Sequence, residues 1–442
     1  MPATGFTSET LIRDSLYDRI PLSLEERALI ESSAFGRLER IQQLGFVSKV
    51  WPAAHHTRFE HSLGVLHLVR LAVEQLRAHP AGMFLTDGDA RTIVAAALLH
   101  DIGHYPFSHA VEELGHPVWP HEKVGRAIVE GSEIAALLER IWHVDPGRVA
   151  TFIDPAGKDL SPTDRLLRGV LSGALDMDKL DYLPRDARAC NVPYGGVDAS
   201  RLIDSLTIVT PETSPSSKEQ SVGITHKGVS PLHSLITARQ EMFDNVYWHH
   251  TNRACMAMLL RAVQDALTAG SLAPDRLQSL DDRTLLDMLS LPSMPPSTRQ
   301  LADSLQTRRL HKRAVEISFR ASGLYQRLSA LFFEPATRRA VELRMVDTLA
   351  ETIGDSVDSA AILIDIPKPE KWRTDVWVSF AHPPIGASPL MHWRDVVGLS
   401  DDDFKRYEVH RRLIRIVAIE PLRSIVSDRW EQLLLPSLGA VI

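Results

Sequence analysis

The chain has 442 residues, a formal net charge of −7 and 44% hydrophobic residues. This length allows one large domain with additions or two to three ordinary domains, and the apolar content is sufficient for a large core. The acidic balance excludes a general attraction to nucleic acid or to an anionic membrane, so a polyanionic ligand requires a local cluster of Lys and Arg. The chain has only two cysteines, which predicts a reducing compartment. Its opening segment is unlike a leader peptide and no long apolar run is present, so we expect a cytoplasmic protein without a membrane span.

Apolar residues recur at intervals of three and four along most of the chain, which predicts a mainly α-helical fold. Residues 14–40 are expected to be helical after an extended start, with Ser23 able to cap the first helix. The short stretch 46–51, which Pro52 ends, predicts a strand or an extended loop. Longer helices are expected at 58–79, at 88–100 with Asp87 as the cap, and at 121–140, 162–183 and 231–269.

Three later regions differ from this helical pattern. Residues 206–229 contain two β-branched segments around a Ser- and Pro-rich stretch, which predicts a β-hairpin inserted into the helical protein. Residues 274–299 predict short helical turns at the surface. Beyond residue 319, the segments AAILIDIP, TDVWVSFA and 408–419 predict strands and 422–434 predicts a helix, so we expect a small α+β region there.

The stretch 95–110, AAALLHDIGHYPFSHA, combines a buried apolar run with several ionisable side chains. Such groups are costly to bury unless they are paired or bound to a metal ion. His100 and Asp101 would need further ligands, for which His61 and Asp178 on other predicted helices are candidates. This mixed nitrogen and oxygen set suits Mn²⁺, Fe²⁺, Zn²⁺ or Mg²⁺. The alternative is that each histidine is an ordinary core residue with its hydrogen bonds satisfied.

Four blocks in a fixed order, HHTRFEHSLGV, LLHDIGHYPFSHA, PHEKVG and DMDKLDYLPRDA, resemble the HD-domain superfamily of phosphohydrolases. The resemblance spans roughly residues 10–260 and is strongest to the deoxynucleoside triphosphate triphosphohydrolases. Within that family, the chain resembles the catalytic core of the members that also carry a SAM module, but the SAM module itself has no counterpart in this sequence. It implies a helical HD-domain core over 1–320, with the hairpin at about 206–229 as an insertion, and an α+β region over 321–442 that makes subunit contacts. It also implies one divalent metal ion held by His61, His100, Asp101 and Asp178.

Cleavage of a phosphoester requires a proton donor for the leaving oxygen, and histidine suits that role near neutral pH. The resemblance implies His121 as this general acid, with His104 and His109 beside the phosphates. Glu112 stands where the family has an acidic residue that orients the histidine. The alternative for His121 is an ordinary histidine at the start of a helix, next to Pro120.

A triphosphate carries about four negative charges, so an acidic protein must supply local cations. The candidates are Arg58, Lys179 and Arg239, although a solvated helix face is the usual position of a single basic residue. The resemblance further implies that Tyr247 stacks on the base and that Tyr182 packs against the sugar.

Three more residues are expected at the sugar. Gln43 and Asp186 correspond to groups that hydrogen-bond the 3′-hydroxyl, and Leu44 to the apolar residue that excludes a 2′-hydroxyl. Pro184 is expected to kink the helix and to displace Asp186. The histidines expected to lie outside the site are His55, His56, His67, His79 and His116.

The predicted reaction is the metal-dependent hydrolysis of a dNTP at its α-phosphorus to a deoxynucleoside and inorganic triphosphate, with an additional Mg²⁺ on the triphosphate left open. Two alternatives stay open: action on another nucleotide or on single-stranded nucleic acid ends, and a catalytically silent nucleotide-binding scaffold. Nucleic acid is not expected as the main partner. Similarity implies a homo-oligomer, dimer or tetramer. The positions matching the family's regulatory site, Thr10, Leu11, Gly36 and Glu39, lack positive charge, so activation by the same route is not expected, while another nucleotide effector remains open.

Overall fold

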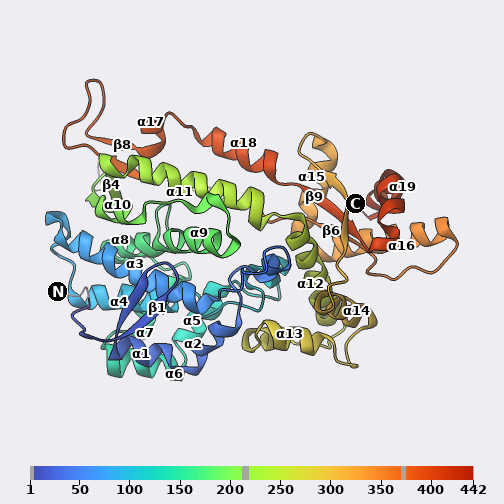
Figure 1. Ribbon diagram of the computed structural model, residues 1–442, viewed down its shortest axis with the longest axis horizontal. Coiled ribbons are helices and arrows are strands. Elements are labelled where there is room, and N and C mark those ends of the chain that lie inside the picture. Colours follow the sequence, from blue (N-terminus) through green and yellow to red (C-terminus); the bar gives the residue numbers. More distant parts are fainter. Residues whose placement is uncertain (1–3, 212–218, 370–374, 442) are drawn as a thin grey trace.

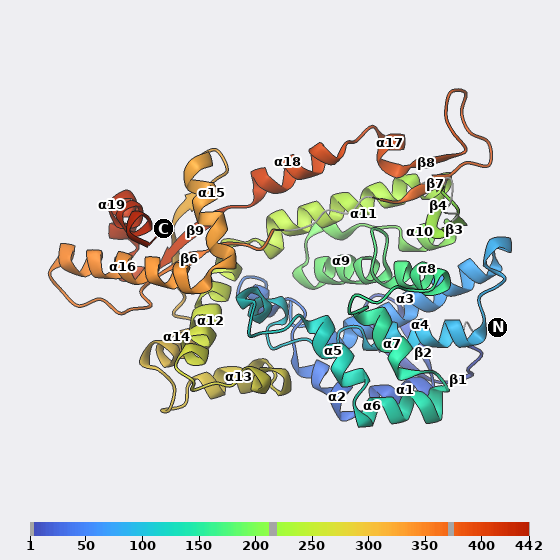
Figure 2. The same ribbon diagram turned by 180° about the vertical axis from the view of Figure 1, so that it is seen from behind.

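The computed structural model describes residues 4–211, 219–369 and 375–441, and it confirms the mainly α-helical fold. Helices of the first 250 residues form one body, and α12 to α16 with α19 form a second group beside it (Figures 1 and 2). Helix α18 (Asp401–Arg411) lies along α11 (Val229–Met242) in both views, and the Tyr407 hydroxyl donates a hydrogen bond to the Gln240 carbonyl. No helix among the described residues combines the length and apolar character needed to cross a membrane.

The chain opens with an antiparallel hairpin of β1 (Ser8–Asp14) and β2 (Asp18–Ser23), so a helix beginning at residue 14 is wrong. Asp18 has a positive φ of 58° and turns the chain between the strands. Ser23 does cap α1 (Leu24–Ile30), in a capping box with Glu26. The short helix α2 (Ser33–Gly36) and a 3₁₀ helix (Arg37–Arg40) follow.

Residues 45–49 form a 3₁₀ helix (Gly45–Lys49) and not the expected strand or extended loop. Within residues 4–211, 219–369 and 375–441, no strand pairs with this stretch, and its backbone hydrogen bonds are local, as from the Val47 amide to the Leu44 carbonyl. Whether a stretch of β-branched residues forms a strand depends on such tertiary partners more than on its intrinsic β-propensity. The stretch therefore forms part of a turn beside the site and no part of a sheet.

The centre of the molecule is the pair α3 (Arg58–Ala78) and α4 (Asp87–Leu99), which pack on each other. Both were predicted within one residue, although the cap of α4 is Thr86, whose side chain accepts from the Asp89 amide, and not Asp87. Every α4 residue from 92 to 99 is buried, which explains the uncharged run in the sequence.

Three long helices predicted from periodicity are each interrupted. The first is divided into α5 (His121–Val129), α6 (Ser132–Leu137) and a π-helical turn (Leu138–Trp142); the second into α8 (Pro162–Leu171) and α9 (Met177–Cys190); and the third into α11, a π-helical turn (Phe243–Tyr247) and α12 (His250–Thr268). Asp178 consequently lies on α9 and not on a helix that starts near Pro162. The Asp176 side chain caps α9 by accepting from the Lys179 amide.

The predicted hairpin is confirmed as β3 (Leu206–Val209) and β4 (Ser221–Thr225), joined in antiparallel register. It is not an isolated insertion, because β4 also pairs in parallel with β7 (Trp377–Ser379), and β7 pairs with β8 (Leu390–His392). The C-terminal region therefore completes a four-stranded sheet with the first body.

The remaining strands form an antiparallel sheet in the order β5 (Lys312–Ile317), β9 (Ile414–Ala418) and β6 (Ile362–Asp365). Residues 408–411 belong to α18, so the predicted strand 408–419 is correct only in its second half. The apolar core beside this sheet is built with α16 (Pro335–Ile353) and α19 (Arg423–Val441). The other helices are α7 (Pro146–Ile153), α10 (Ala199–Asp204), α13 (Asp282–Leu289), α14 (Pro296–Gln306), α15 (Ser322–Ala330) and α17 (Trp393–Val397), with 3₁₀ turns at Pro80–Gly82, Ser108–Leu114, Pro193–Gly195, His226–Gly228, Pro274–Ser279, Leu331–Phe333 and Glu420–Leu422.

Candidate active site

A cavity of about 540 Å³ opens where α3, α9, α11 and α12 meet the loop that follows α4. Two predicted site residues, His61 and Glu112, do not line it but contact residues that do. The predicted site residues that line it are Gln43, Leu44, Arg58, His100, Asp101, His104, His109, His121, Asp178, Lys179, Tyr182, Asp186, Arg239 and Tyr247. Folding thus brings residues from positions 43 to 247 to one place.

His61 lies in the first turn of α3 and is fully buried. Its Nδ1 lies 2.8 Å from Asp181 Oδ2, so Nδ1 carries the proton that this hydrogen bond requires. Its Nε2 faces Asp178 Oδ1 at 3.0 Å and Asp101 Oδ2 at 3.7 Å. A lone pair on Nε2 would therefore point at two carboxylates, an arrangement that a cation between them would stabilise.

His100 repeats this arrangement at the end of α4. Its Nδ1 lies 2.8 Å from the Ala97 carbonyl, which only accepts, so Nδ1 is the protonated nitrogen. Its Nε2 is buried without a hydrogen-bond partner in the described part of the chain and lies 3.3 Å from Asp101 Oδ1. The ligand atoms of His61, His100 and Asp101 thus lie close together, and Asp178 Oδ1 lies beside them, 3.0 Å from His61 Nε2 and 3.9 Å from His100 Nε2. This donor set fits a divalent metal ion.

The electrostatics of these residues agree with a cation at this point. Burial would lower the pKa of His61, but the adjacent carboxylates of Asp178 and Asp181 raise it to about 10. Burial would raise the pKa of Asp178, but His61 and His100 hold it at about 2. The pocket therefore favours an added positive charge strongly, and a divalent ion bound to neutral imidazoles supplies that charge as well as a proton does.

Asp181, which the sequence analysis did not single out, supports this centre from behind. It accepts from His61 on one side and is bound by both Nε and Nη2 of Arg185, each at 2.8–2.9 Å, and Tyr17 donates to it at 2.9 Å. Carboxylates that hold the second nitrogen of a ligating histidine fix its tautomer and orientation. The available signal was the spacing of Asp178 and Asp181 by three residues, which places both on one face of α9.

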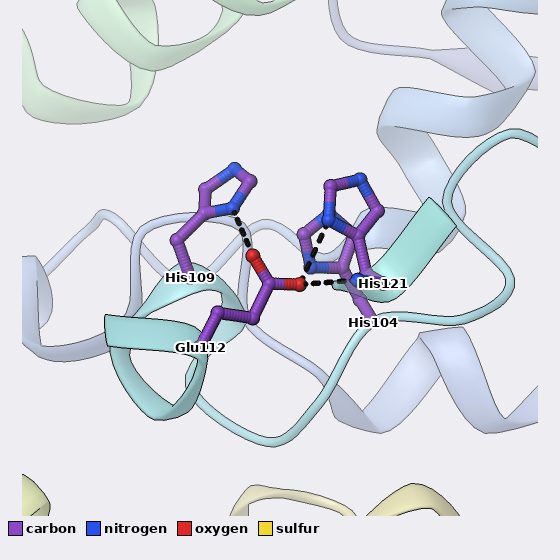
Figure 3. A group of neighbouring side chains, drawn as sticks. All are labelled: His104, His109, Glu112 and His121. Carbon is purple, nitrogen blue, oxygen red and sulfur yellow. Dashed lines mark hydrogen bonds and ion pairs between the residues drawn. The ribbon is translucent and has the colours of Figure 1, made fainter. Parts of the chain in front are cut away.

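His104, His109, Glu112 and His121 form a second cluster (Figure 3). Glu112 Oε1 accepts from both the backbone amide and Nδ1 of His121 at 2.8 Å, and Oε2 lies 3.2 Å from His109 Nδ1. Burial would lower the pKa of His121, but Glu112 raises it to about 9. His121 is thus a cation near neutral pH, with Nδ1 oriented by Glu112.

His104 connects the two clusters. Its ring stacks on that of His121 with centroids 3.8 Å apart, and its Nε2 lies 3.2 Å from Asp101 Oδ1. Burial, with Arg58 and His121 nearby, holds the pKa of His104 well below its ordinary value. His104 is therefore a neutral ring that lies between the carboxylate of Asp101 and the charged ring of His121.

The predicted cations all reach the cavity but are partly engaged with protein groups. Arg58 is buried and donates to Asp101 at 2.5 Å and to Ser108 at 2.9 Å. Lys179 donates to Asp176 at 2.6 Å, so it must turn away from that cap to contact a ligand. Arg239 lies beside Tyr182 and over the ring of Phe243. Arg168, which the sequence analysis did not single out, also lines the cavity.

The opposite end of the cavity is organised around Asp186. This carboxylate accepts from the Tyr247 hydroxyl at 2.6 Å and lies 2.7 Å from His56 Nε2. Pro184 lies inside an unbroken α9, so the expected displacement of Asp186 is wrong: the residues after Pro184 continue the helix and Asp186 still lines the cavity. His56 was expected to lie outside the site, yet it contacts Asp186.

Comparison with known proteins agrees with this geometry. An HD domain matches residues 58–160, and an HD associated region matches residues 197–379. The uncharacterized protein MJ1154 of Methanocaldococcus jannaschii is 32% identical over 70% of this chain and 60% of its own length. The uncharacterized protein YwfO of Bacillus subtilis is 33% identical, over 54% and 51% respectively. The human deoxynucleoside triphosphate triphosphohydrolase SAMHD1 is 25% identical, over 57% and 44%.

A solved structure of a hypothetical protein from Aquifex aeolicus has the same fold, with a TM-score of 0.70 and 24% identity over 95% of this chain and 99% of that one. The chain spans between about half and three fifths of the curated relatives it matches first. The HD domain recognised from the sequence blocks is thereby confirmed. This chain carries an HD domain and an HD associated region, and over half of its length is similar to the SAMHD1 triphosphohydrolases.

Proposed function

We propose that this protein is a metal-dependent hydrolase that cleaves deoxynucleoside triphosphates into a deoxynucleoside and inorganic triphosphate. The observation that carries the proposal is the adjacency of the candidate metal ligands and the Glu112-bound His121, linked through Asp101 and His104. Hydrolysis of a phosphoester needs both an activated water and a proton donor, and the two clusters offer these on one cavity wall.

His61, His100, Asp101 and Asp178 would hold the metal ion. When bound, a divalent ion there polarises a phosphoryl oxygen and makes water more acidic. Water attacks the α-phosphorus and forms a new phosphorus–oxygen bond, the bond from that phosphorus to the 5′ oxygen breaks, and His121 gives its proton to the departing 5′ oxygen. The proton that the attacking water loses passes to solvent, from which His121 is protonated again. Glu112 keeps the ring oriented through Nδ1, which leaves Nε2 as the donor. The deoxynucleoside and triphosphate are then released.

The remaining lining residues suit the two ends of such a substrate. Arg58, Lys179 and Arg239 would bind the triphosphate, with His109 beside them. Asp186 and Gln43 would take the 3′-hydroxyl, Leu44 would exclude a 2′-hydroxyl, and Tyr182 and Tyr247 would pack on sugar and base. The buried Gln43 Oε1 has no hydrogen-bond partner among the described residues, which supports a polar ligand at that position.

A product assay tests the proposal. The metal-loaded protein is incubated with each of the four dNTPs, with and without other nucleotides as effectors, and products are separated by ion-exchange chromatography. Deoxynucleoside and triphosphate in equal amounts are expected from at least one dNTP. Pyrophosphate or monophosphate as products would refute attack at the α-phosphorus. Cleavage of another nucleotide or of single-stranded DNA alone would support the alternative substrates, and binding without turnover would support a silent scaffold.

A further inference from the structure

Arg253 on α12 joins the C-terminal sheet to the turn that carries the proton-donor cluster. Its Nη1 and Nη2 donate to the two oxygens of Glu113 at 3.0 and 3.2 Å. Its Nε and Nη2 also donate to Asp365 Oδ1, at the end of β6, at 3.0 and 2.6 Å. The side chain of Arg253 is only 4% exposed, and those of Glu113 and Asp365 are 7% and 1% exposed. Two buried carboxylates from distant parts of the chain thus share one guanidinium.

Glu113 is the neighbour of Glu112 in the 3₁₀ turn Ser108–Leu114. A short 3₁₀ turn has poor hydrogen-bond geometry and is not rigid by itself. It begins after Phe107, whose φ of 58° lies in the left-handed region. External contacts must therefore fix the rotation of this turn. Packing against α12 and the paired bonds from Arg253 to Glu113 are such contacts.

We propose that Arg253 is a positioning residue, which fixes the Glu112–His121 proton donor relative to the C-terminal sheet through Glu113. The expected effect on turnover rests on the proposed function, whereas the positioning of Glu112 and His121 by Arg253 does not depend on it. A bidentate carboxylate pair fixes both distance and orientation, which a single contact does not. Asp365 binds the other side of the guanidinium, so Arg253 connects β6 to the 3₁₀ turn. A shift of the C-terminal sheet would therefore move Glu112 and change the orientation of His121.

The charged groups that surround His121 come from several elements. Glu112 and His109 face it from the 3₁₀ turn, and His104 stacks on it from the loop after α4. The other two are Glu122 in α5, with Oε2 3.4 Å from Nδ1, and Asp101, which acts from further away. Only Glu112 and His109 depend on the orientation of the turn. Loss of Arg253 should therefore weaken the Glu112 interaction and leave the others in place.

The experiment compares the wild type with Arg253→Met and Arg253→Lys. The matched control is Arg261→Met, because Arg261 lies on the same helix, is 3% exposed and pairs with the C-terminal Glu342, away from the cavity. The titration of His121 is followed by NMR in histidine-labelled protein, with the signal identified from its loss in His121→Gln. The kcat, KM and bound metal of each variant are measured over pH 6 to 10.

Arg253→Met is expected to lower the pKa of His121 by about one unit, to lower kcat about twofold at pH 8 and about tenfold at pH 10, and to leave KM and bound metal unchanged. Arg253→Lys should restore part of both effects, and Arg261→Met should change neither. An unchanged His121 titration in Arg253→Met would overturn the proposal. So would an equal change in Arg261→Met, because that would indicate a general loss of stability.

If Arg253→Met does not fold, Glu113→Gln replaces it, since this variant keeps the shape and leaves Arg253 paired with Asp365. The same shift in the pKa of His121 is expected, and its absence would contradict the proposal. The NMR titration uses no substrate. Lack of dNTP hydrolysis in the wild type would therefore refute the proposed function while the titration still decides the role of Arg253.

Discussion

Asp181 lies directly behind His61, with its Oδ2 2.8 Å from Nδ1 of that histidine, and it is itself held by Arg185. The pair fixes the tautomer that presents the Nε2 lone pair of His61 to the candidate metal centre. Residues in this position typically raise metal affinity without touching the metal. The importance of this pair can be measured directly.

Asp181→Asn is expected to weaken metal binding about 10- to 100-fold, because the amide no longer attracts the Nδ1 proton as strongly. Titration with Mn²⁺ or Co²⁺ into the chelator-treated protein measures the affinity. Asp186→Asn is the matched control, since Asp186 lies on the same helix but contacts His56 and Tyr247. Equal affinities in both variants and in the wild type would contradict a supporting role for Asp181.

Asp101→Ala should remove bound metal and turnover together, whereas His121→Gln should lower turnover about 10²- to 10⁴-fold and leave the metal bound. The physical reason is that Asp101 supplies a carboxylate to the metal centre, while His121 supplies a proton. Metal content by elemental analysis and steady-state kinetics separate the two effects. Loss of metal from His121→Gln would make His121 a ligand instead of an acid.

The rate should fall as pH rises through about 9, because the pKa of His121 is raised to about 9 and only its protonated form can donate. Glu112→Gln should move this basic limb to lower pH, since the carboxylate of Glu112 is the largest cause that raises this pKa. A pH–rate profile of both proteins checks the shift. Superimposed profiles would exclude Glu112 as the partner of the titrating group.

The same shift affects stability. The pKa of His121 is about 9 in the folded protein and about 6.5 when unfolded, so its contribution is fully present below about pH 6.5. This contribution is lost as the pH rises through about 9. Urea unfolding between pH 6 and 10 should therefore show a smaller loss of stability in His121→Gln than in the wild type.

Gly103→Ala should impair the site, because an added Cβ would lie 2.1 Å from the His121 carbonyl and 2.3 Å from the Gly125 amide. Such overpacking typically costs about 1–3 kcal/mol, and here it would push the start of α5 away from the loop after α4. Gly125→Ala is the control, since its nearest contact would be 3.5 Å. Thermal unfolding and kcat measure both, and equal tolerance of the two changes would contradict this packing argument.

Leu44→Gly should increase the use of rNTPs relative to dNTPs, because removal of this side chain opens space beside the expected sugar position. The measurement is the ratio of kcat/KM for each dNTP and its ribonucleotide. An unchanged ratio would assign sugar selection to another residue that lines the cavity.

Some features of this protein follow from local sequence. The apolar periodicity of 58–79 and 88–100 predicts α3 and α4, because a helix side chain is placed by neighbours three and four residues away. The ordered blocks around His61, His100 and Asp178 predict a mixed nitrogen and oxygen metal set. The HD-domain recognition is confirmed, while the roles of single residues and the domain boundary at residue 320 stay predictions.

Other features depend on which distant segments meet. Periodicity did not reveal the breaks between α8 and α9 or around α6, because apolar residues continue across them in register. The strand β4 pairs with β7, which lies some 150 residues later in the chain, and Asp186 contacts His56 in the loop before α3. Arg253, Glu113 and Asp365 carry no local signal, since each is an ordinary charged residue in the sequence. Only the packed structure removes these charges from water, and that burial is what makes their pairing strong and specific.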